Sequence, residues 1–297
     1  MARLLGSAQS GGASLRERLA SGETVLAPGC YDALGARLVE DAGFPAAYMT
    51  GFGSAAARLG RPDIGLMSLP EMVDNARRIV QAVDIPVVAD ADTGYGNSIN
   101  VIRTVREYEA AGVAAIHIED QVMPKKCGHM EGKQVVPARE MAAKVSAAVA
   151  ARRSPEFLII ARTDARAVEG LDGAIARARL YREAGADALF VEAPQSETEI
   201  EAVARAFPDV PLLFNYAEGG KTPAVGYDRL RSLGFSLVIF PLTLLLVATQ
   251  AMRAALARVK ADGTPIELLP SLLPFEEFLD FIGLPEVREL EQRFAET

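Results

Sequence analysis

The sequence contains little cysteine, little histidine and no tryptophan. Among its 297 residues are two cysteines, Cys30 and Cys127, and two histidines. Two cysteines far apart in sequence do not make the disulfide framework of a small secreted protein, so we expect a reducing compartment, the cytoplasm. The sequence also lacks the paired Cys and His spacing that is typical of zinc sites.

Long apolar runs and an excess of positive charge are missing as well. The most apolar run, Leu242 to Ala248, is far shorter than the roughly 20 residues that cross a membrane. The N-terminal segment around Leu15–Arg18 is charged and has no apolar core of signal-peptide length. A formal net charge of −8 argues against a nucleic-acid or anionic-membrane partner, although a local basic site for a small anion stays open. We therefore expect a soluble protein that binds neither membrane nor nucleic acid.

From Thr24 onward one pattern repeats: a short apolar run, a loop with glycine or acidic residues, and an amphipathic helical stretch. Strands that are apolar on both faces and alternate with helices predict a parallel sheet. Eight such units predict an α/β fold closed into a (β/α)8 barrel, and an open doubly wound sheet is the alternative. The predicted strands are Thr24–Pro28, Ala46–Thr50, Pro86–Ala89, Ala115–Ile118, Phe157–Ala161, Ala188–Val191, Pro211–Phe214 and Ser236–Phe240.

Two of the helical stretches between these strands have clear ends. The stretch Leu69–Val83 follows Ser68, and Glu71 lies three residues later, which is the pattern of a capping box. The stretch Ile99–Ala111 ends at Gly112, a residue that commonly terminates helices.

The C-terminal part departs from the repeating pattern. Residues 242–259 predict a long apolar helix, and residues 275–294 predict a second one. A helix that is apolar around most of its surface needs more burial than one barrel flank provides. One interpretation is a subunit interface in a homodimer or homotetramer, with exchange of these helices between subunits as one arrangement. The other is packing on the same barrel. We treat 1–297 as one barrel domain with a helical tail from about residue 242.

Five consecutive residues, Lys125–His129, bring together two lysines, a cysteine, a glycine and a histidine. Positive charge beside a thiol lowers its pKa and makes it a usable acid or nucleophile. The loop follows the predicted strand Ala115–Ile118 and would leave the carboxyl end of that strand. A solvated basic turn with an incidental cysteine is the alternative.

In barrels of this kind the active site forms at the carboxyl ends of the strands. Asp90 and Asp92 follow the third predicted strand, and Glu119 follows the fourth. Carboxylate oxygens in this arrangement predict a site for Mg²⁺ or Mn²⁺. The alternative is that the aspartates cap the following turn while Glu119 pairs with a lysine.

Other strands also end in polar or glycine-containing segments. The second runs into Tyr48–Gly53, where glycines let backbone N–H groups approach an anion. Arg162 follows the fifth strand and requires a carboxylate partner, either a ligand's or that of Asp164. Glu192 and Asn215 follow the sixth and seventh. Together these side chains predict one polar mouth.

The remaining cysteine and histidine are interpreted as core residues. His117 lies inside an apolar strand, where a hydrogen-bonded core histidine is the expected reading. Cys30 follows Pro28 near the end of the first strand, where a small buried residue is expected.

In combination these residues resemble the isocitrate lyase and phosphoenolpyruvate mutase superfamily, and Lys125–His129 is similar to the signature loop of its lyase branch. Length and loop are similar to methylisocitrate lyases, 2,3-dimethylmalate lyases and oxaloacetate hydrolases, whereas phosphonate mutases generally lack the Cys-Gly-His loop. The resemblance rests on Tyr48–Gly53, Pro62-Asp63, Asp90–Gly96, Glu119–Gln121, Lys125–His129, Ala161–Ala165 and Asn215.

The resemblance implies Mg²⁺, with Mn²⁺ as an option, held through Asp90 and Asp92 with Glu119 in the surrounding shell. It implies cleavage of the C2–C3 bond of a 2-hydroxy dicarboxylate to an α-keto acid, with Cys127 protonating the leaving carbanion. Tyr48 is a candidate for removing the 2-hydroxyl proton. The implied substrate contacts are backbone N–H groups at Thr50 and Gly51, the neighbouring Phe52, and Lys125, Gly128, His129, Arg162, Glu192 and Asn215.

Two departures from the family pattern bear on the substrate. Methylisocitrate lyases carry an arginine shortly after strand eight that helps to bind an extra carboxylate, and Leu246 stands at the corresponding place here. Oxaloacetate hydrolases tend to have a serine where this chain has Pro241. We therefore expect a 2-alkylmalate such as 2,3-dimethylmalate, cleaved to pyruvate and a monocarboxylate. Oxaloacetate hydrolysis or decarboxylation, a carboxyphosphonate mutase and a non-catalytic barrel are the alternatives.

Overall fold

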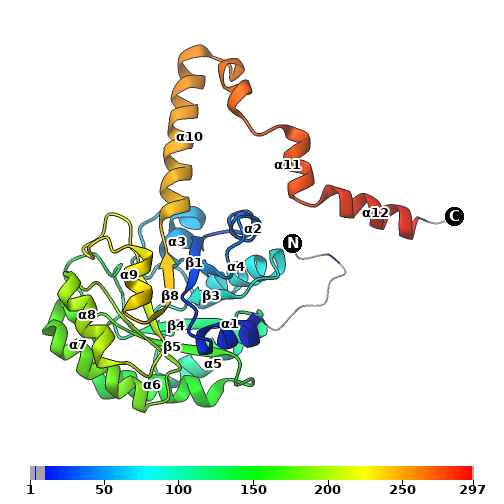
Figure 1. The fold of residues 1–297 in the computed structure, drawn as a ribbon. Coiled ribbons are helices and arrows are strands. Elements are labelled where there is room, and N and C mark those ends of the chain that lie inside the picture. Colours follow the sequence, from blue (N-terminus) through cyan, green and yellow to red (C-terminus); the bar gives the residue numbers. More distant parts are fainter. Residues whose placement is uncertain (1–3, 5–10, 296–297) are drawn as a thin grey trace. The chain divides into compact units, whose positions relative to one another are not determined.

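The computed structural model describes residue 4 and residues 11–295. Eight parallel strands form a closed barrel in sequence order (Figure 1). Pairing of Val25 with Leu237 joins the first strand to the last. The predicted (β/α)8 barrel is confirmed, and closure excludes the open doubly wound sheet. The strands are β1 Val25–Cys30, β2 Ala47–Met49, β3 Val87–Asp90, β4 Ala115–Glu119, β5 Leu158–Thr163, β6 Ala188–Val191, β7 Leu212–Asn215 and β8 Phe235–Phe240.

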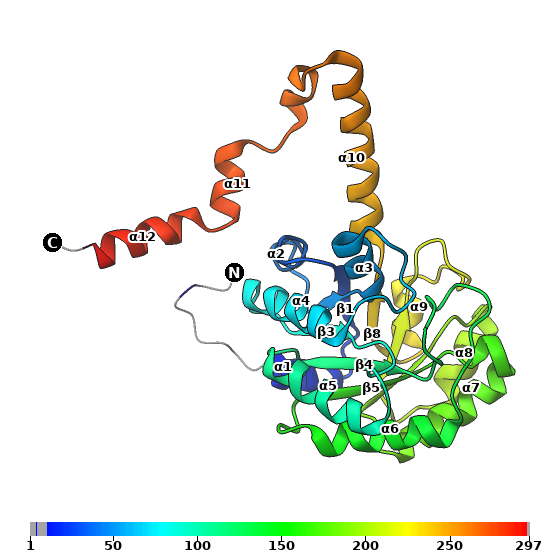
Figure 2. The same cartoon turned by 180° about the vertical axis from the view of Figure 1, so that it is seen from behind.

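Helices cover the outside of the barrel, and α5, α6 and α7 lie side by side on it in both views (Figures 1 and 2). The capping box predicted at Ser68 and Glu71 is present at the start of α4. The helices are α1 Gly11–Ala20, α2 Ala33–Asp41, α3 Gly51–Leu59, α4 Leu69–Ala82, α5 Ser98–Ala110, α6 Ala138–Ala151, α7 Arg166–Glu183, α8 Glu197–Ala206, α9 Tyr227–Ser232, α10 Thr243–Asp262, the 3-10 helix η1 Ile266–Ser271, α11 Phe275–Phe281 and α12 Leu284–Phe294.

One end of the barrel is closed by apolar side chains. Leu15 and Leu19 of α1 pack with Val25 and Leu158, which lie at the amino ends of their strands. Alternate strand residues face the helices instead, as Val87 does. Because α1 fills the amino end, the polar residues that follow the strands are left to the carboxyl end.

The chain divides into two compact units, one ending at Leu244 and the other beginning at Leu245. The second unit contains most of α10 together with η1, α11 and α12. The single helix predicted for residues 275–294 is wrong, because Gly283 adopts a left-handed φ of 95° and separates α11 from α12. Among the helices of residues 11–295, none is both long enough and apolar enough to cross a membrane.

Candidate active site

A cavity lies where the strands of the barrel end, and segments following β2 to β8 line it. Most of the predicted site residues border it, whereas Gly51, Asp92 and Glu119 lie just behind its wall. The lining residues are Tyr48, Thr50, Phe52, Asp63, Asp90, Lys125, Cys127, Gly128, His129, Arg162, Glu192, Asn215, Ala217, Glu218, Gly219, Gly220, Pro241 and Leu242.

The Lys125 side chain forms ion pairs with two aspartates at one side of the cavity. Its ammonium Nζ lies 2.7 Å from Asp92 Oδ1 and 2.5 Å from Asp63 Oδ1. The Lys125 side chain is 2% exposed, so this cation is shielded from solvent and committed to its two partners. Asp63 was not among the site residues predicted from sequence, although Pro62-Asp63 formed part of the family resemblance.

Asp90 and Asp92 both lie buried at the end of β3. The Asp92 N–H donates to Asp90 Oδ1 at 2.9 Å, so Asp90 does cap this turn, as the alternative reading had it. Its second oxygen, Oδ2, lies so close to Gly51 that a Cβ there would stand 2.4 Å away. Gly51 is therefore needed for space, because any side chain would displace the Asp90 carboxylate.

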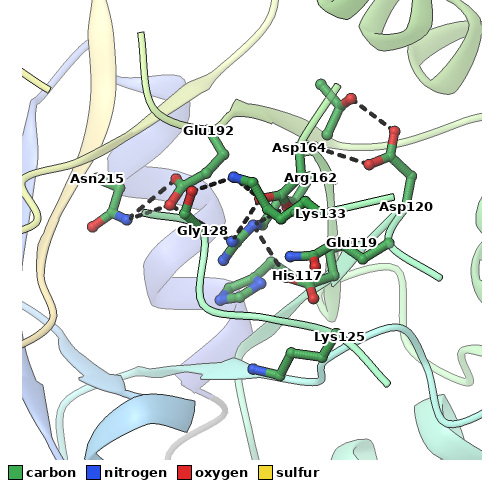
Figure 3. A network of polar contacts seen from close by, with 12 residues as sticks. His117, Glu119, Asp120, Lys125, Gly128, Lys133, Arg162, Asp164, Glu192 and Asn215 are labelled. Atoms are coloured by element: carbon green, nitrogen blue, oxygen red, sulfur yellow. Dashed lines mark hydrogen bonds and ion pairs between the residues drawn. The ribbon is translucent and has the colours of Figure 1, made fainter. Parts of the chain in front are cut away.

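Arg162 stands at the centre of a second group of charges. Its Nε lies 2.9 Å from Asp164 Oδ2 and 3.2 Å from Glu119 Oε2, and its Nη2 lies 3.6 Å from Glu192 Oε1 (Figure 3). The predicted partner Asp164 is present. Glu119 pairs with Arg162 rather than with a lysine.

Glu192 receives hydrogen bonds from the next strand and faces the loop after β4. Asn215 Nδ2 lies 3.2 Å from each carboxylate oxygen, and His129 Nε2 lies 3.3 Å from Oε1. Burial alone would raise the pKa of Glu192, but Arg162 and His129 lower it below its ordinary value. Because the Lys221 N–H donates to His129 Nδ1 at 3.0 Å, a ring hydrogen lies on Nε2, the nitrogen that faces Glu192.

The prediction that neighbouring charge lowers the pKa of Cys127 is wrong. Lys125 points to Asp63 and Asp92, and Lys126 Nζ donates to the carbonyl groups of Glu131 and Gly132. Burial instead raises the pKa of the Cys127 thiol above its ordinary value of 9.0. The thiol is consequently protonated at neutral pH, which suits an acid better than a nucleophile.

Tyr48 and His117 form a buried hydrogen-bonded pair next to Asp90. Tyr48 Oη lies 2.8 Å from His117 Nε2, while His117 Nδ1 lies 3.8 Å from Asp90 Oδ1. Burial lowers the pKa of His117 to about 4, so the ring is neutral. His117 is a core residue, as expected, but it also orients a side chain that lines the cavity. Cys30 is fully buried, also as expected.

Two further findings concern residues around the site. The predicted role of the Thr50 N–H is wrong, because this group donates to the Cys30 carbonyl at 3.1 Å. Lys133, which sequence analysis did not single out, is buried against Asp164, with Nζ 3.0 Å from Oδ1. Its position four residues after His129 was the only sequence signal for it.

Buried carboxylates outnumber buried cations around the cavity. Burial raises the pKa of Asp92 to about 6, and it raises the pKa of Glu119 well above its ordinary value. Glu119 Oε1 is buried without a hydrogen-bond partner. The carboxylates are Asp63, Asp90, Asp92, Glu119, Asp164 and Glu192, against the cations Lys125, Lys133 and Arg162.

This excess of carboxylate oxygen fits the preferences of a divalent cation. Across residue 4 and residues 11–295, no three His, Cys, Asp or Glu side chains lie close enough to hold an ion by themselves. Mg²⁺ commonly uses one or two protein carboxylates and completes its shell with water and substrate oxygens. Asp90, which lines the cavity, and Asp92, which keeps one oxygen on Lys125, can supply these two carboxylates, and Glu119 is paired with Arg162.

Comparison with known proteins identifies the family. Residues 15–260 match the family described as phosphoenolpyruvate phosphomutase. The chain belongs to this family. It is 47% identical to 2,3-dimethylmalate lyase of Eubacterium barkeri, over 95% of this chain and 98% of that protein. It is 46% identical to 2-methylisocitrate lyase of Aeropyrum pernix, over 96% of this chain and 91% of that protein. The predicted superfamily and its lyase branch are confirmed, and with them a carbon–carbon lyase.

Two solved structures of family members bear on the chemistry. Oxaloacetate acetylhydrolase in complex with 3,3-difluorooxalacetate is 37% identical, with a TM-score of 0.91 and coverage of 98% of this chain and 99% of that one. Phosphonopyruvate hydrolase in complex with oxalate and Mg²⁺ is 32% identical, with a TM-score of 0.88 and coverage of 97% and 100%. In the second of these structures Mg²⁺ occurs together with a dicarboxylate.

Proposed function

We propose that the protein cleaves the C2–C3 bond of a 2-alkylmalate, such as 2,3-dimethylmalate, to pyruvate and a monocarboxylate. The observation that carries the proposal is a protonated thiol, Cys127, in the same cavity as the buried carboxylate Asp90. The first can deliver a proton and the second can hold a divalent cation, which are the two requirements of such a cleavage. The similarity to 2,3-dimethylmalate lyase supports the same reading.

The wall of the cavity supports an alkyl-substituted substrate. Phe52, Ala217, Pro241 and Leu242 contribute apolar surface to a cavity whose other lining residues are mostly polar or charged. Gly29 leaves room for the bend after β8, since a Cβ there would lie 2.7 Å from the Pro241 carbonyl oxygen. Moving a methyl group of C2 or C3 from water onto this wall would cost less free energy than moving a third carboxylate there. The similarity to methylisocitrate lyase is almost as high, so the preference rests on this wall and on the predicted place of Leu246.

The substrate carboxylate and 2-oxygen would lie near Asp90 and Asp92. Mg²⁺, or Mn²⁺ in its place, would be held by these two carboxylates and would supply positive charge beside the substrate oxygens. Arg162 adds a fixed cation, and Glu119 holds that guanidinium in position. The Gly51 N–H, at the start of α3, is the backbone donor that we place at the substrate carboxylate.

Proton transfers at both ends of the breaking bond are assigned to residues of the cavity. Tyr48 is a phenol that burial keeps neutral and that is hydrogen-bonded to His117 Nε2. We place it at the 2-hydroxyl, whose proton would leave through Tyr48 to solvent as the 2-oxygen becomes the carbonyl of the keto acid. The C2–C3 electron pair leaves with C3, and the Cys127 S–H protonates that carbon. Glu192, Asn215, His129 and the backbone of Gly128 would surround the departing carboxylate. A reducing compartment such as the cytoplasm would keep this thiol free, and we place the protein there.

A panel of substrates tests the proposed reaction. We expect release of pyruvate from 2,3-dimethylmalate, with a kcat/KM at least about tenfold above that for 2-methylisocitrate, because one unpaired buried carboxylate costs more than 1.4 kcal/mol. The measurement is keto-acid formation followed with a coupled dehydrogenase. Faster turnover of 2-methylisocitrate would contradict the assignment of the apolar wall.

The same assay separates a second candidate function. The close structural likeness to oxaloacetate acetylhydrolase favours oxaloacetate hydrolysis as the alternative. Incubation with oxaloacetate, with oxalate and acetate resolved from pyruvate and carbon dioxide, distinguishes hydrolysis from decarboxylation. Oxalate formed faster than pyruvate is released from dimethylmalate would replace the lyase assignment. Inactivity on every diacid would point to the carboxyphosphonate mutase or to a non-catalytic barrel.

We also propose that the protein is a homodimer or homotetramer. Val247, Met252 and Leu256 of α10 are each more than half exposed, and this helix buries none of its side chains. Apolar side chains exposed in such number commonly mark a protein interface. Light scattering is expected to give a mass of two or four 31.7-kDa chains, and a monomeric mass would refute the proposal. Helix exchange between subunits remains a prediction.

A further inference from the structure

The loop that carries Cys127 follows β4, and its two ends are hydrogen-bonded to each other. Gln121 and Val135 form an isolated antiparallel bridge, and the Val122 N–H donates to the Gln134 carbonyl at 2.9 Å. Residues 123–133 therefore form an excursion with a narrow neck. Any contact between this excursion and the barrel wall influences where the thiol stands over the cavity.

Lys133 makes such a contact. Its Nζ donates to the Gly128 carbonyl oxygen and to Asp164 Oδ1, the latter at 3.0 Å (Figure 3). The Lys133 side chain is 2% exposed and that of Asp164 is fully buried. One acceptor belongs to the excursion, next to Cys127, and the other belongs to the end of β5. A buried ammonium thus joins the thiol-bearing segment to the wall.

Asp164 is a rigid anchor for this contact. Its backbone N–H donates to Asp120 Oδ1 at 2.9 Å, and its Oδ2 accepts from Arg162 Nε at 2.9 Å. Asp120 in turn accepts from the Thr163 and Tyr181 hydroxyls, each at 2.7 Å. The anchor keeps Arg162 as a partner without Lys133, so the loss of this lysine leaves no unpaired buried charge in the barrel.

At the other end of the contact, the Gly128 backbone packs tightly against the barrel. A Cβ at Gly128 would lie 2.0 Å from Glu192 Oε1 and 2.6 Å from Arg162 Nη2. The Gly128 backbone is therefore seated directly on two residues that line the cavity. A shift of this backbone by about 1 Å would move Cys127 out of reach of a fixed substrate carbon.

We propose that Lys133 is the positioning residue that fastens the loop across the cavity and thereby sets the place of Cys127. When the excursion lifts away, Lys133 loses Asp164 but can keep the Gly128 carbonyl, so the docked and lifted positions differ by one charge-assisted hydrogen bond to the barrel. The catalytic consequence rests on the proposed function. The placement of the thiol does not.

Thiol reactivity in Lys133→Met tests the placement without any substrate. Methionine keeps a long apolar side chain and removes the ammonium. Cys30 is fully buried, so reaction of the native protein with 5,5′-dithiobis(2-nitrobenzoate) reports Cys127. We expect Lys133→Met to react about 10- to 100-fold faster than the wild type, the range that charge-assisted hydrogen bonds correspond to. Pyruvate release should show a fall in kcat/KM of the same order.

Lys126→Met is the matched control. It is the same substitution in the same excursion, but Lys126 Nζ donates to the carbonyl groups of Glu131 and Gly132, which belong to the loop itself. We expect a thiol rate within about twofold of the wild type, because no contact to the barrel is lost. The melting temperatures of both variants confirm that the folded protein is being compared.

Two results would overturn the proposal: a folded Lys133→Met protein with the wild-type thiol rate, or an equal acceleration in Lys126→Met. Failure of the lyase assignment would look different, because the wild type would then release no pyruvate while the thiol rates of the variants still differed.

Discussion

Replacement of Cys127 by alanine is expected to lower the rate of pyruvate release by about 10² to 10⁴ while the protein stays folded, since a positioned general acid contributes a factor of this size. The Cys127 side chain borders the cavity, and burial holds its pKa above 9.0. The carbanion that forms at C3 needs a proton from a group that is protonated at neutral pH. Within the cavity lining, Cys127 is the thiol that meets this condition.

Cys30→Ala is the matched control for this variant. Cys30 is fully buried at the end of β1 and does not line the cavity, so its replacement should leave kcat unchanged. A small loss of stability is expected, because removal of a buried sulfur leaves a cavity in the core. Wild-type turnover in Cys127→Ala would exclude the thiol as the acid.

The pH profile offers an independent check on the same residue. Because its pKa is raised, the Cys127 thiol stays protonated as pH increases through neutrality, and its proton is lost only above pH 9.0. The cleavage rate should therefore not decline on account of this group until the solution is alkaline. A serine hydroxyl does not ionise in that range, so Cys127→Ser should be slow but should lack the alkaline decline that the thiol causes.

Removal of divalent cations is the second change with a large expected effect. Treatment with EDTA should abolish pyruvate release, and Mg²⁺ should restore it. Among the residues that the structure describes, and with Glu119 protonated as its raised pKa indicates, five buried carboxylates remain around the cavity against three buried cations. A dianionic substrate entering without further positive charge would therefore meet net repulsion. Full turnover after exhaustive chelation would show that the carboxylates serve another purpose.

Mg²⁺ binding can also be measured without substrate. A cation at 100 times its Kd should stabilise the folded protein by about 2.7 kcal/mol and raise its melting temperature. We expect the rise to disappear in Asp90→Asn, because the amide removes a charged ligand. Asp228→Asn is the matched control, since Asp228 is 89% exposed in its side chain on α9. An equal rise in wild type and Asp90→Asn would rule out Asp90 as a ligand.

Much of the architecture was predictable because it depends on short-range patterns. The eight apolar runs became the eight strands, with boundaries that moved by one or two residues, as where β5 extends to Thr163. The capping box at Ser68 also depends on residues within one helical turn. The helix predicted for residues 275–294 failed for an equally local reason, since helix-spaced apolar residues continue on both sides of Gly283 although that residue ends the helix.

The sequence predicted which residues form the candidate site, but not which of them pair with one another. Asp90, Arg162, Glu192 and Asn215 were found because a closed parallel barrel brings the carboxyl ends of its strands together, whatever their spacing in sequence. Their partners depend on side-chain directions in space. Lys125 lies two residues from Cys127 in sequence but is engaged with Asp63, which lies 62 residues before it.

The sequence by itself determined the order of strands and helices, the end of the barrel at which polar groups gather and the residue types available there, because these follow from periodicity and from the direction of a parallel strand. Only the tertiary structure decided the protonation of Cys127 and Asp92 and the docking of Lys133. A pKa depends on burial and on the nearest charges, and both are set by residues that fold together from distant parts of the chain.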